Sequence, residues 1–320
     1  MLVNSICIRH GWLMVNSWKK VLGGWFSLSR LPFHTVGIMP FVLGTILAWK
    51  FTSSFNAPVF MLGISALILI MLSTYHAGEY SDIREDEISR RLHDSKFAGG
   101  SGIIQQGILP RRAALWTSII SLLLAGCIGI ILQFYFKTGP FTLPLGALGA
   151  FAGLFYSLRP VRLVERGWGE LLIGFCYGWL TIASAYYIQT ATIHPLVHWL
   201  AIPVGLSIIN VILLNEFPDA EADKKTGKRN LLYRLGKKAT TALYTLLALL
   251  TSATLLYSVK LGVPLTVSYF YLPFFLISLF IILMLLRGKH EEQKFLEVLC
   301  GLNIAVNLGT SLSFLLAYII

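Results

Sequence analysis

Long apolar runs constrain the fold of this chain more than any other feature of its sequence. The segments 113–133, 239–259 and 265–286 each hold about twenty residues without an Asp, Glu, Lys or Arg, which is enough α-helix to cross roughly 30 Å of hydrocarbon. Helices of soluble proteins keep a polar face, whereas these runs are apolar on every face. The chain is 56% hydrophobic and only 13% charged, against roughly 25% charged residues in soluble domains. The sequence therefore predicts an all-α integral membrane protein.

Counting such segments predicts a bundle of about nine transmembrane helices, and the two short ones leave counts of eight or ten open. Residues 1–32 form a separate N-terminal segment, and residues 33–320 form the transmembrane domain. Within the first segment, Gly11–Arg30 fits either a helix lying in the membrane interface or a disordered leader. The predicted spans are 33–50, 57–75, 113–133, 141–157, 170–188, 197–216, 239–259, 265–286 and 295–318.

The basic residues predict how the bundle is oriented. With nine spans, all of the 26 Lys and Arg residues except Lys50, Lys137 and Lys260 fall on one side. The positive-inside rule makes that side cytoplasmic, so we expect a multi-pass protein of the inner (cytoplasmic) membrane with its N-terminus cytoplasmic and its C-terminus outside. The same asymmetry explains the net charge of +11 as topology and attraction to anionic lipid, so no nucleic-acid partner is expected.

The acidic residues gather on that same side, in two clusters. Ten of the 15 Asp and Glu residues follow the second or the sixth predicted span. If the helices continue beyond the apolar runs, each cluster places a stripe of oxygen-bearing side chains on one helix face. The first stripe is Glu79, Asp82 and Asp86, at i, i+3 and i+7, and the second is Asn215, Asp219 and Asp223, at i, i+4 and i+8.

Such stripes predict a metal–diphosphate site. Like charges at these spacings repel by a few tenths of a kcal/mol per pair, so a cation would offset a cost that a purely structural helix does not need. Mg²⁺ binds carboxylate oxygens together with substrate phosphates, and interleaved basic residues suit a diphosphate. The alternative is a pair of solvated, salt-bridged loops. The best basic candidates are Arg91 and Lys96 in the first loop and Lys228 and Arg229 in the second.

The two clusters resemble the motifs of the UbiA prenyltransferase superfamily, NDxxDxxxD after the second transmembrane helix and DxxxD after the sixth. Here the first runs from Gly78-Glu79 through Asp82 to Asp86, and the second from Asn215 through Asp219 to Asp223. Motif order and helix count also agree, so the resemblance covers nearly the whole chain. Softer signatures are similar to the 1,4-dihydroxy-2-naphthoate prenyltransferase branch of menaquinone biosynthesis: Arg30-Leu31-Pro32-Phe33, Phe97 to Gly102, and Arg166-Gly167-Trp168-Gly169-Glu170.

The first motif departs from the family pattern at two positions. Gly78 stands where the family usually has Asn, which removes an amide that could hold metal or diphosphate. Glu79 stands where the family has Asp, which keeps the charge but moves it one methylene further from the backbone. The change could mark a different donor, a different acceptor or weakened activity.

The resemblance implies Mg²⁺-dependent transfer of an isoprenyl group from a prenyl diphosphate to an aromatic acceptor, in a cavity that faces the cytoplasm. Under this reading Asp82, Asp86, Asp219 and Asp223 are catalytic and, with Glu79, hold the metal. Binding of the diphosphate or the acceptor would fall to Asn215, Arg91, Lys96, Tyr156, Arg159, Lys228 and Arg229.

Three alternatives remain beside the naphthoate acceptor. The acceptor could be another molecule, such as a 4-hydroxybenzoate-like phenol or another lipid precursor. The protein could be a non-catalytic member that binds a lipid quinone. A transporter is disfavoured, because charges that mark a pathway lie at mid-membrane and most of these spans lack them. Prenyl chain length and oligomeric state are not predicted.

Overall fold

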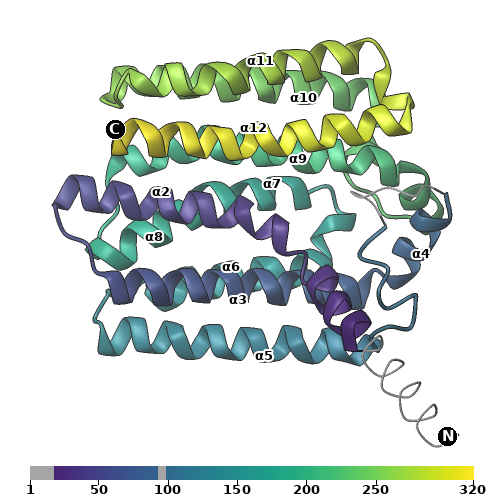
Figure 1. The fold of residues 1–320 in the computed structure, drawn as a ribbon, viewed down its shortest axis with the longest axis horizontal. Coiled ribbons are helices and arrows are strands. Elements are labelled where there is room, and N and C mark those ends of the chain that lie inside the picture. The colour runs from purple at the N-terminus through teal and green to yellow at the C-terminus, as the bar shows by residue number, and fades with distance from the viewer. Residues whose placement is uncertain (1–17, 93–98) are drawn as a thin grey trace, which may run out of the picture.

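The computed structural model describes residues 18–92 and 99–320, which form layers of long helices lying side by side (Figure 1). The main helices are α2 (Thr35–Thr52), α3 (Ala57–Ser81), α5 (Arg111–Ile130), α6 (Thr142–Ser157), α9 (Pro195–Thr226), α10 (Leu231–Tyr257), α11 (Thr266–Leu286) and α12 (Gln293–Ile319). The π-helical turn η2 (Ile131–Tyr135) continues α5, and η4 (Cys176–Leu180) joins α7 (Gly169–Phe175) to α8 (Thr181–Thr190). The short elements are η1 (Leu31–His34), α4 (Ile83–Leu92), η3 (Leu163–Glu165), η5 (Ser258–Leu261) and η6 (Lys289–Glu291).

The helices confirm the predicted membrane bundle. Within the described residues, eight helices are long and apolar enough to cross a membrane, and α6 adds a shorter apolar helix. The predicted bounds were least accurate around the sixth and seventh spans. α9 continues to Thr226, beyond the expected end at 216, and α10 begins at Leu231, before the expected start at 239. A helix does not stop where the apolar run stops, because polar side chains can continue its surface into water.

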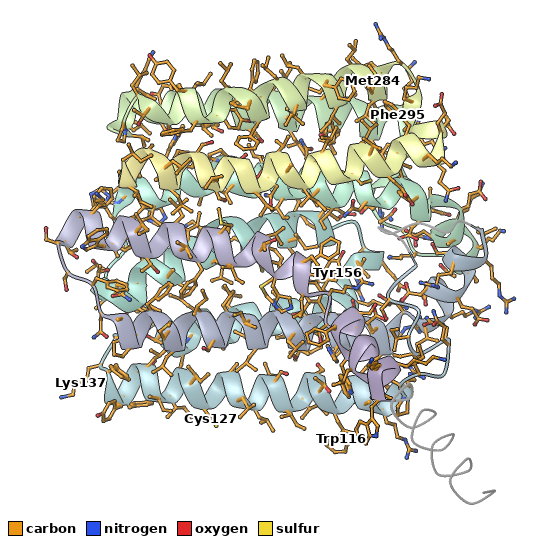
Figure 2. All side chains as sticks on the ribbon, viewed as in Figure 1. Trp116, Cys127, Lys137, Tyr156, Met284 and Phe295 are labelled. Atoms are coloured by element: carbon orange, nitrogen blue, oxygen red, sulfur yellow. The ribbon has the colours of Figure 1, made fainter. Side chains whose placement is uncertain are left out.

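The outer surface of the bundle is apolar, as a lipid-facing surface must be. On α5, Trp116 and Leu123 are 60% and 65% exposed, and Figure 2 shows Trp116 and Cys127 on the outer edge of the molecule. Lys137 lies at the end of the bundle opposite α4 (Figure 2). The chain is therefore a multi-pass membrane protein with short polar ends.

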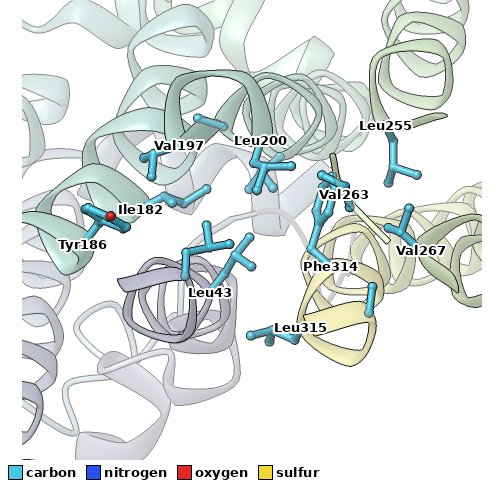
Figure 3. Close-up of a cluster of buried hydrophobic side chains, with 14 of the residues drawn as sticks. Leu43, Ile182, Tyr186, Val197, Leu200, Leu255, Val263, Val267, Phe314 and Leu315 are labelled. Atoms are coloured by element: carbon cyan, nitrogen blue, oxygen red, sulfur yellow. The ribbon is translucent and has the colours of Figure 1, made fainter. Parts of the chain in front are cut away.

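The centre of the bundle is packed by α2, α8, α9 and α12. Leu43, Ile182, Leu200 and Phe314 are fully buried in one cluster (Figure 3). Gly44 permits this close packing, because a Cβ at that position would collide with the backbone carbonyl of Ile182. Small residues allow membrane helices to approach in this way.

A buried polar network ties α9, α10 and α12 together. Asn303 Nδ2 donates to the Asn210 carbonyl at 2.8 Å, and Asn303 Oδ1 accepts from the Tyr244 hydroxyl at 2.9 Å. Asn210 Nδ2 in turn donates to the Tyr244 carbonyl at 3.2 Å. Interhelical hydrogen bonds of this kind typically stabilise a membrane bundle by about 0.6 kcal/mol each.

Before α2, residues 18–28 form a helix that packs on the same end of the bundle as α4 (Figure 1). Leu28 is buried against Ile103 and Leu109, and Trp25 stacks on the ring of His76. The outer face of this helix exposes Trp18, Leu22 and Phe26. A position in the membrane interface remains a prediction for this segment.

Candidate active site

A cavity of about 770 Å³ opens among α3, α5, α6, α7 and α9, and the two acidic motifs line one end of it. Its walls are mostly apolar, with Leu67 and Ile70 from α3 and Leu154 from α6. The motifs lie more than a hundred residues apart in the sequence but meet here, because the ends of α3 and α9 lie beside α4. Ser89 on α4 donates a short hydrogen bond to Asp219 Oδ1 on α9, which fixes one motif against the other. The cavity therefore has an acidic end that is continuous with an apolar remainder. The acidic end is lined by Asp82, Asp86, Asn215, Asp219 and Asp223.

The second motif carries its own cation. α9 ends at Thr226, and the next residue, Gly227, has a φ of +76° that turns the chain back. Lys228 Nζ thereby lies 3.5 Å from Asp223 Oδ1. Asn230 donates to the other oxygen of Asp223 at 2.7 Å. Lys228 and Asn230 both line the cavity.

Arg162 is the main cation at the first motif. One of its nitrogens, Nη2, donates to Asp82 Oδ1 at 2.8 Å and to Glu85 Oε1 at 2.7 Å, while Nη1 lies 2.8 Å from Glu165 Oε1. Its side chain is buried. Sequence reasoning favoured Arg159, three residues earlier in the same loop, and missed Arg162 because both arginines follow α6 at the same membrane face.

Burial and charge shift the titration of these groups. Burial raises the pKa of Asp82, although Lys228 and Arg162 oppose the shift. Burial also raises the pKa of Asp86 well above its ordinary value, and Glu79 and Asp82 add to that rise. Burial lowers the pKa of Lys228, but Asp223 and Asp82 outweigh it and raise the pKa overall. The site thus favours a bound cation near its carboxylates, because their charged forms are otherwise costly.

Glu79 is placed differently from the aspartates. Its Oε1 accepts hydrogen bonds from Arg30 Nη2 at 3.0 Å and from the Ser101 amide at 2.8 Å. Its Oε2 accepts from the Ser101 hydroxyl at 2.7 Å. Next to it, Gly78 lines the cavity, and the atom nearest to a Cβ placed there would be Ser157 Oγ, at 3.5 Å.

The other predicted substrate-binding residues fall into two groups. Tyr156 lines the cavity beside Gly78 and Asp82, and Figure 2 shows it between the helix layers. Arg91, Arg159 and Arg229 are exposed and are not among the residues that line the cavity. Arg91 pairs instead with Glu87 on its own helix. Lys96 lies outside the described residues.

Glu170 of the Arg-Gly-x-Gly-Glu segment has a structural role. Its Oε1 accepts from the amide of Leu231 at 2.9 Å, and Glu216 accepts from the amide of Leu232 at 3.2 Å. Both carboxylates thus sit at the N-terminus of α10, where negative charge is stabilising. These two hydrogen bonds fix the start of α10 and with it the preceding segment 227–230, which carries Lys228.

The donor set fits a metal that shares its ligands with a substrate. Within the described residues, no three acidic, His or Cys side chains converge on one point, so the chain alone forms no complete metal cage. Mg²⁺ commonly binds only one or two carboxylates and completes its shell with phosphate oxygens and water. Asn215 adds an unused oxygen, since its buried Oδ1 has no hydrogen-bond partner in this part of the chain. The residues present therefore fit Mg²⁺ bound together with a diphosphate.

Comparisons with known proteins agree with this geometry. Residues 37–304 match the model of the UbiA prenyltransferase family. A 1,4-dihydroxy-2-naphthoate octaprenyltransferase of Bacillus subtilis is 27% identical over 222 residues, which are 68% of each chain. A 2-carboxy-1,4-naphthoquinone phytyltransferase of Synechocystis is 25% identical and covers 69% of each chain.

Solved structures show the same fold. A UbiA homolog from Aeropyrum pernix superposes with a TM-score of 0.68 at 17% identity, over 88% of this chain and 97% of its own. A UbiA homolog from Archaeoglobus fulgidus, bound to GPP and Mg²⁺, gives a TM-score of 0.59 at 14% identity, over 91% and 99%. Since the family model covers most of the chain, this protein belongs to the UbiA prenyltransferase family and is an enzyme of prenyl transfer.

Proposed function

We propose that this enzyme uses Mg²⁺ to transfer an isoprenyl group from a prenyl diphosphate to 1,4-dihydroxy-2-naphthoate. The observation that carries the proposal is the meeting of Asp82 and Asp86 with Asp219 and Asp223 at the polar end of an apolar cavity. A diphosphate needs the polar end of the cavity with its carboxylates, and a prenyl tail needs the apolar part. The naphthoate acceptor is supported by the names of the relatives from Bacillus subtilis and Synechocystis.

In the proposed reaction, Asp82, Asp86, Asp219, Asp223 and the Oδ1 of Asn215 would hold the metal, which would supply Lewis-acid stabilisation of the leaving diphosphate. Lys228 lies beside Asp223 and carries a raised pKa, so it stays charged and stabilises the developing negative charge. Arg162 holds Asp82 in place through its 2.8 Å hydrogen bond. The apolar walls exclude water from the reactive prenyl carbon.

The bonds change as follows. The allylic C–O bond of the donor breaks, and its electron pair leaves with the diphosphate. The ring carbon that bears the carboxylate attacks the allylic cation and forms a C–C bond. Carbon dioxide then leaves, and the electron pair of its bond restores the aromatic ring. Tyr156, on the cavity wall, is the side chain we assign to contact the acceptor. The site would face the cytoplasm, where the positive-inside rule places the charged loops.

The test incubates the purified protein with a series of isoprenyl diphosphates and 1,4-dihydroxy-2-naphthoate, with Mg²⁺ or with chelator, and reads the products by mass. We expect a prenylated, decarboxylated naphthalene only with Mg²⁺. Diphosphate release without that product would show that the acceptor is wrong and that another phenol or lipid precursor should be tried. Absence of both, with every donor, would contradict the proposal and favour a non-catalytic quinone-binding protein.

A further inference from the structure

We propose that Glu79 is a positioning residue that fixes Arg30 and the turn 99–102 over the diphosphate site, and that it is not a metal ligand. The inference rests on the proposed use of a prenyl diphosphate with Mg²⁺, but not on the identity of the acceptor. It revises the expectation that the altered acid of the first motif binds metal alongside Asp82 and Asp86.

Both oxygens of Glu79 accept hydrogen bonds from within the protein. Oε1 accepts from Arg30 and from the Ser101 amide, and Oε2 accepts from the Ser101 hydroxyl. The residue is 2% exposed, so these protein donors replace water around its charge. A metal at Oε1 would have to displace Arg30 or the Ser101 amide, and leaving such donors unpaired in a buried site is costly. Asp82 differs, because Arg162 bonds only its Oδ1.

The length of the Glu79 side chain suits this positioning role. Glu79 reaches from α3 to two separate segments, the residue before η1 and the turn that follows α4. An Asp at the same position would end one methylene closer to its own backbone. The substitution of Glu for the family's usual Asp therefore gives the longer reach that this bridge uses.

The groups that Glu79 bridges lie at the cavity. Arg30, Gly99 and Gly100 all line the cavity beside Asp86. A Cβ on Gly100, whose φ is +61°, would collide with the carboxylate of Asp86. The turn thus lies directly against a proposed metal ligand, and Ser101 is the residue that ties it to α3.

Glu79 also fixes the position of a cation. Arg30 uses Nε and Nη2 on Glu79, which holds its guanidinium at the cavity wall near Asp86. Arginine pairs well with diphosphate oxygens. Glu79 therefore places a cation where the donor's diphosphate would bind, while its own charge keeps that cation paired when the donor is absent.

The test compares Glu79→Gln with Asp82→Asn, using Glu87→Gln as the control because Glu87 is an exposed acid on the neighbouring helix α4. Diphosphate release is measured against Mg²⁺ and against donor concentration. For Glu79→Gln we expect the KM for the prenyl diphosphate to rise about tenfold, as for the loss of one charge-assisted bond, while the Mg²⁺ half-saturation changes less than twofold. Asp82→Asn should raise the Mg²⁺ half-saturation by about tenfold or more.

A second readout needs no activity. Hydrogen exchange of the Ser101 amide should be faster in Glu79→Gln than in the parent protein or in Glu87→Gln, with neither metal nor donor present, because the neutral Gln oxygen is a weaker acceptor than the carboxylate. If the proposed function fails, this change in exchange still appears. Ser101→Ala, which removes the hydroxyl bond to Glu79 and the one from the Ile103 amide but keeps the Ser101 amide bond, serves if Glu79→Gln does not fold and should raise the donor KM by a smaller factor. A shift of the Mg²⁺ half-saturation in Glu79→Gln as large as that in Asp82→Asn, with unchanged exchange at Ser101, would overturn the proposal.

Discussion

Two regions with buried polar groups in this molecule use those groups differently. Between α9, α10 and α12, Asn303, Asn210 and Tyr244 bond to one another, and of their side-chain polar atoms Asn210 Oδ1 alone has no partner among the described residues. At the polar end of the cavity, Asn215 Oδ1 has no partner among the described residues, and Asp219 accepts from Ser89 at only one of its oxygens. The first arrangement stabilises helix packing. The second gathers carboxylates and an unpartnered amide oxygen on the wall of a cavity, where a cation can reach them.

The largest effect on activity should come from a substitution at the polar end of the cavity. Asp219→Asn removes one charge from the proposed metal site, so we expect kcat/KM to fall by at least about a hundredfold with little change in thermal stability. Glu221→Gln, an exposed acid on the same helix, is the matched control and should stay near the parent value. Equal losses in the two variants, measured by diphosphate release, would argue that the region acts only through overall charge.

Substitutions of the two arginines in the loop after α6 should differ clearly in their effect on kcat/KM. Arg162→Gln leaves Asp82 without its buried partner, and we expect kcat/KM to fall about tenfold or more. Arg159→Gln changes an exposed residue outside the cavity and should alter kcat/KM less than twofold. The reverse ranking would contradict the placement of the site.

In the packed region, stability rather than activity should respond. Asn303→Leu removes two interhelical hydrogen bonds, which should lower the free energy of unfolding by about 1–2 kcal/mol. Unfolding in detergent, compared with the activity per folded molecule, measures the two effects separately. A loss of activity without a loss of stability would show that this network serves the reaction instead.

Acidity should weaken metal binding at the cavity end. Burial raises the pKa of Asp86 well above its ordinary value, so protons compete with Mg²⁺ as the pH falls toward that raised pKa. The Mg²⁺ half-saturation concentration should rise by up to about tenfold for each pH unit of acidification below it. Asp86→Asn should flatten this dependence, and an unchanged slope in that variant would exclude Asp86 as its source.

The smallest effect should come from restoring the family residue at position 78. A Cβ there makes only an ordinary contact with Ser157, so Gly78→Asn fits and adds an amide oxygen beside the first motif. We expect the Mg²⁺ half-saturation to fall by about two- to fivefold, as for one added neutral interaction. Gly78→Ala is the control for lost backbone freedom, and an equal change in both would remove any role for the amide.

The sequence by itself determined the membrane class, the approximate number of spans and the end of the bundle that carries the acids. These properties follow from local composition, since each span must be about twenty apolar residues long and each motif has a fixed spacing on its own helix. The family assignment follows from the same motifs, because their order along the chain and the number of helices both agree with the family pattern.

Only the tertiary structure decided which charged residue does what. Arg159 and Arg162 are equivalent in the sequence, yet only Arg162 turns inward to Asp82. Glu79 belongs to the same stripe as Asp82 and Asp86, yet its oxygens are taken by Arg30 and Ser101 from two other segments. The hydrogen-bond partners of a buried carboxylate come from residues far apart in the chain. Spacing along one helix therefore predicts the face on which an acid lies, but not which groups already donate hydrogen bonds to its oxygens.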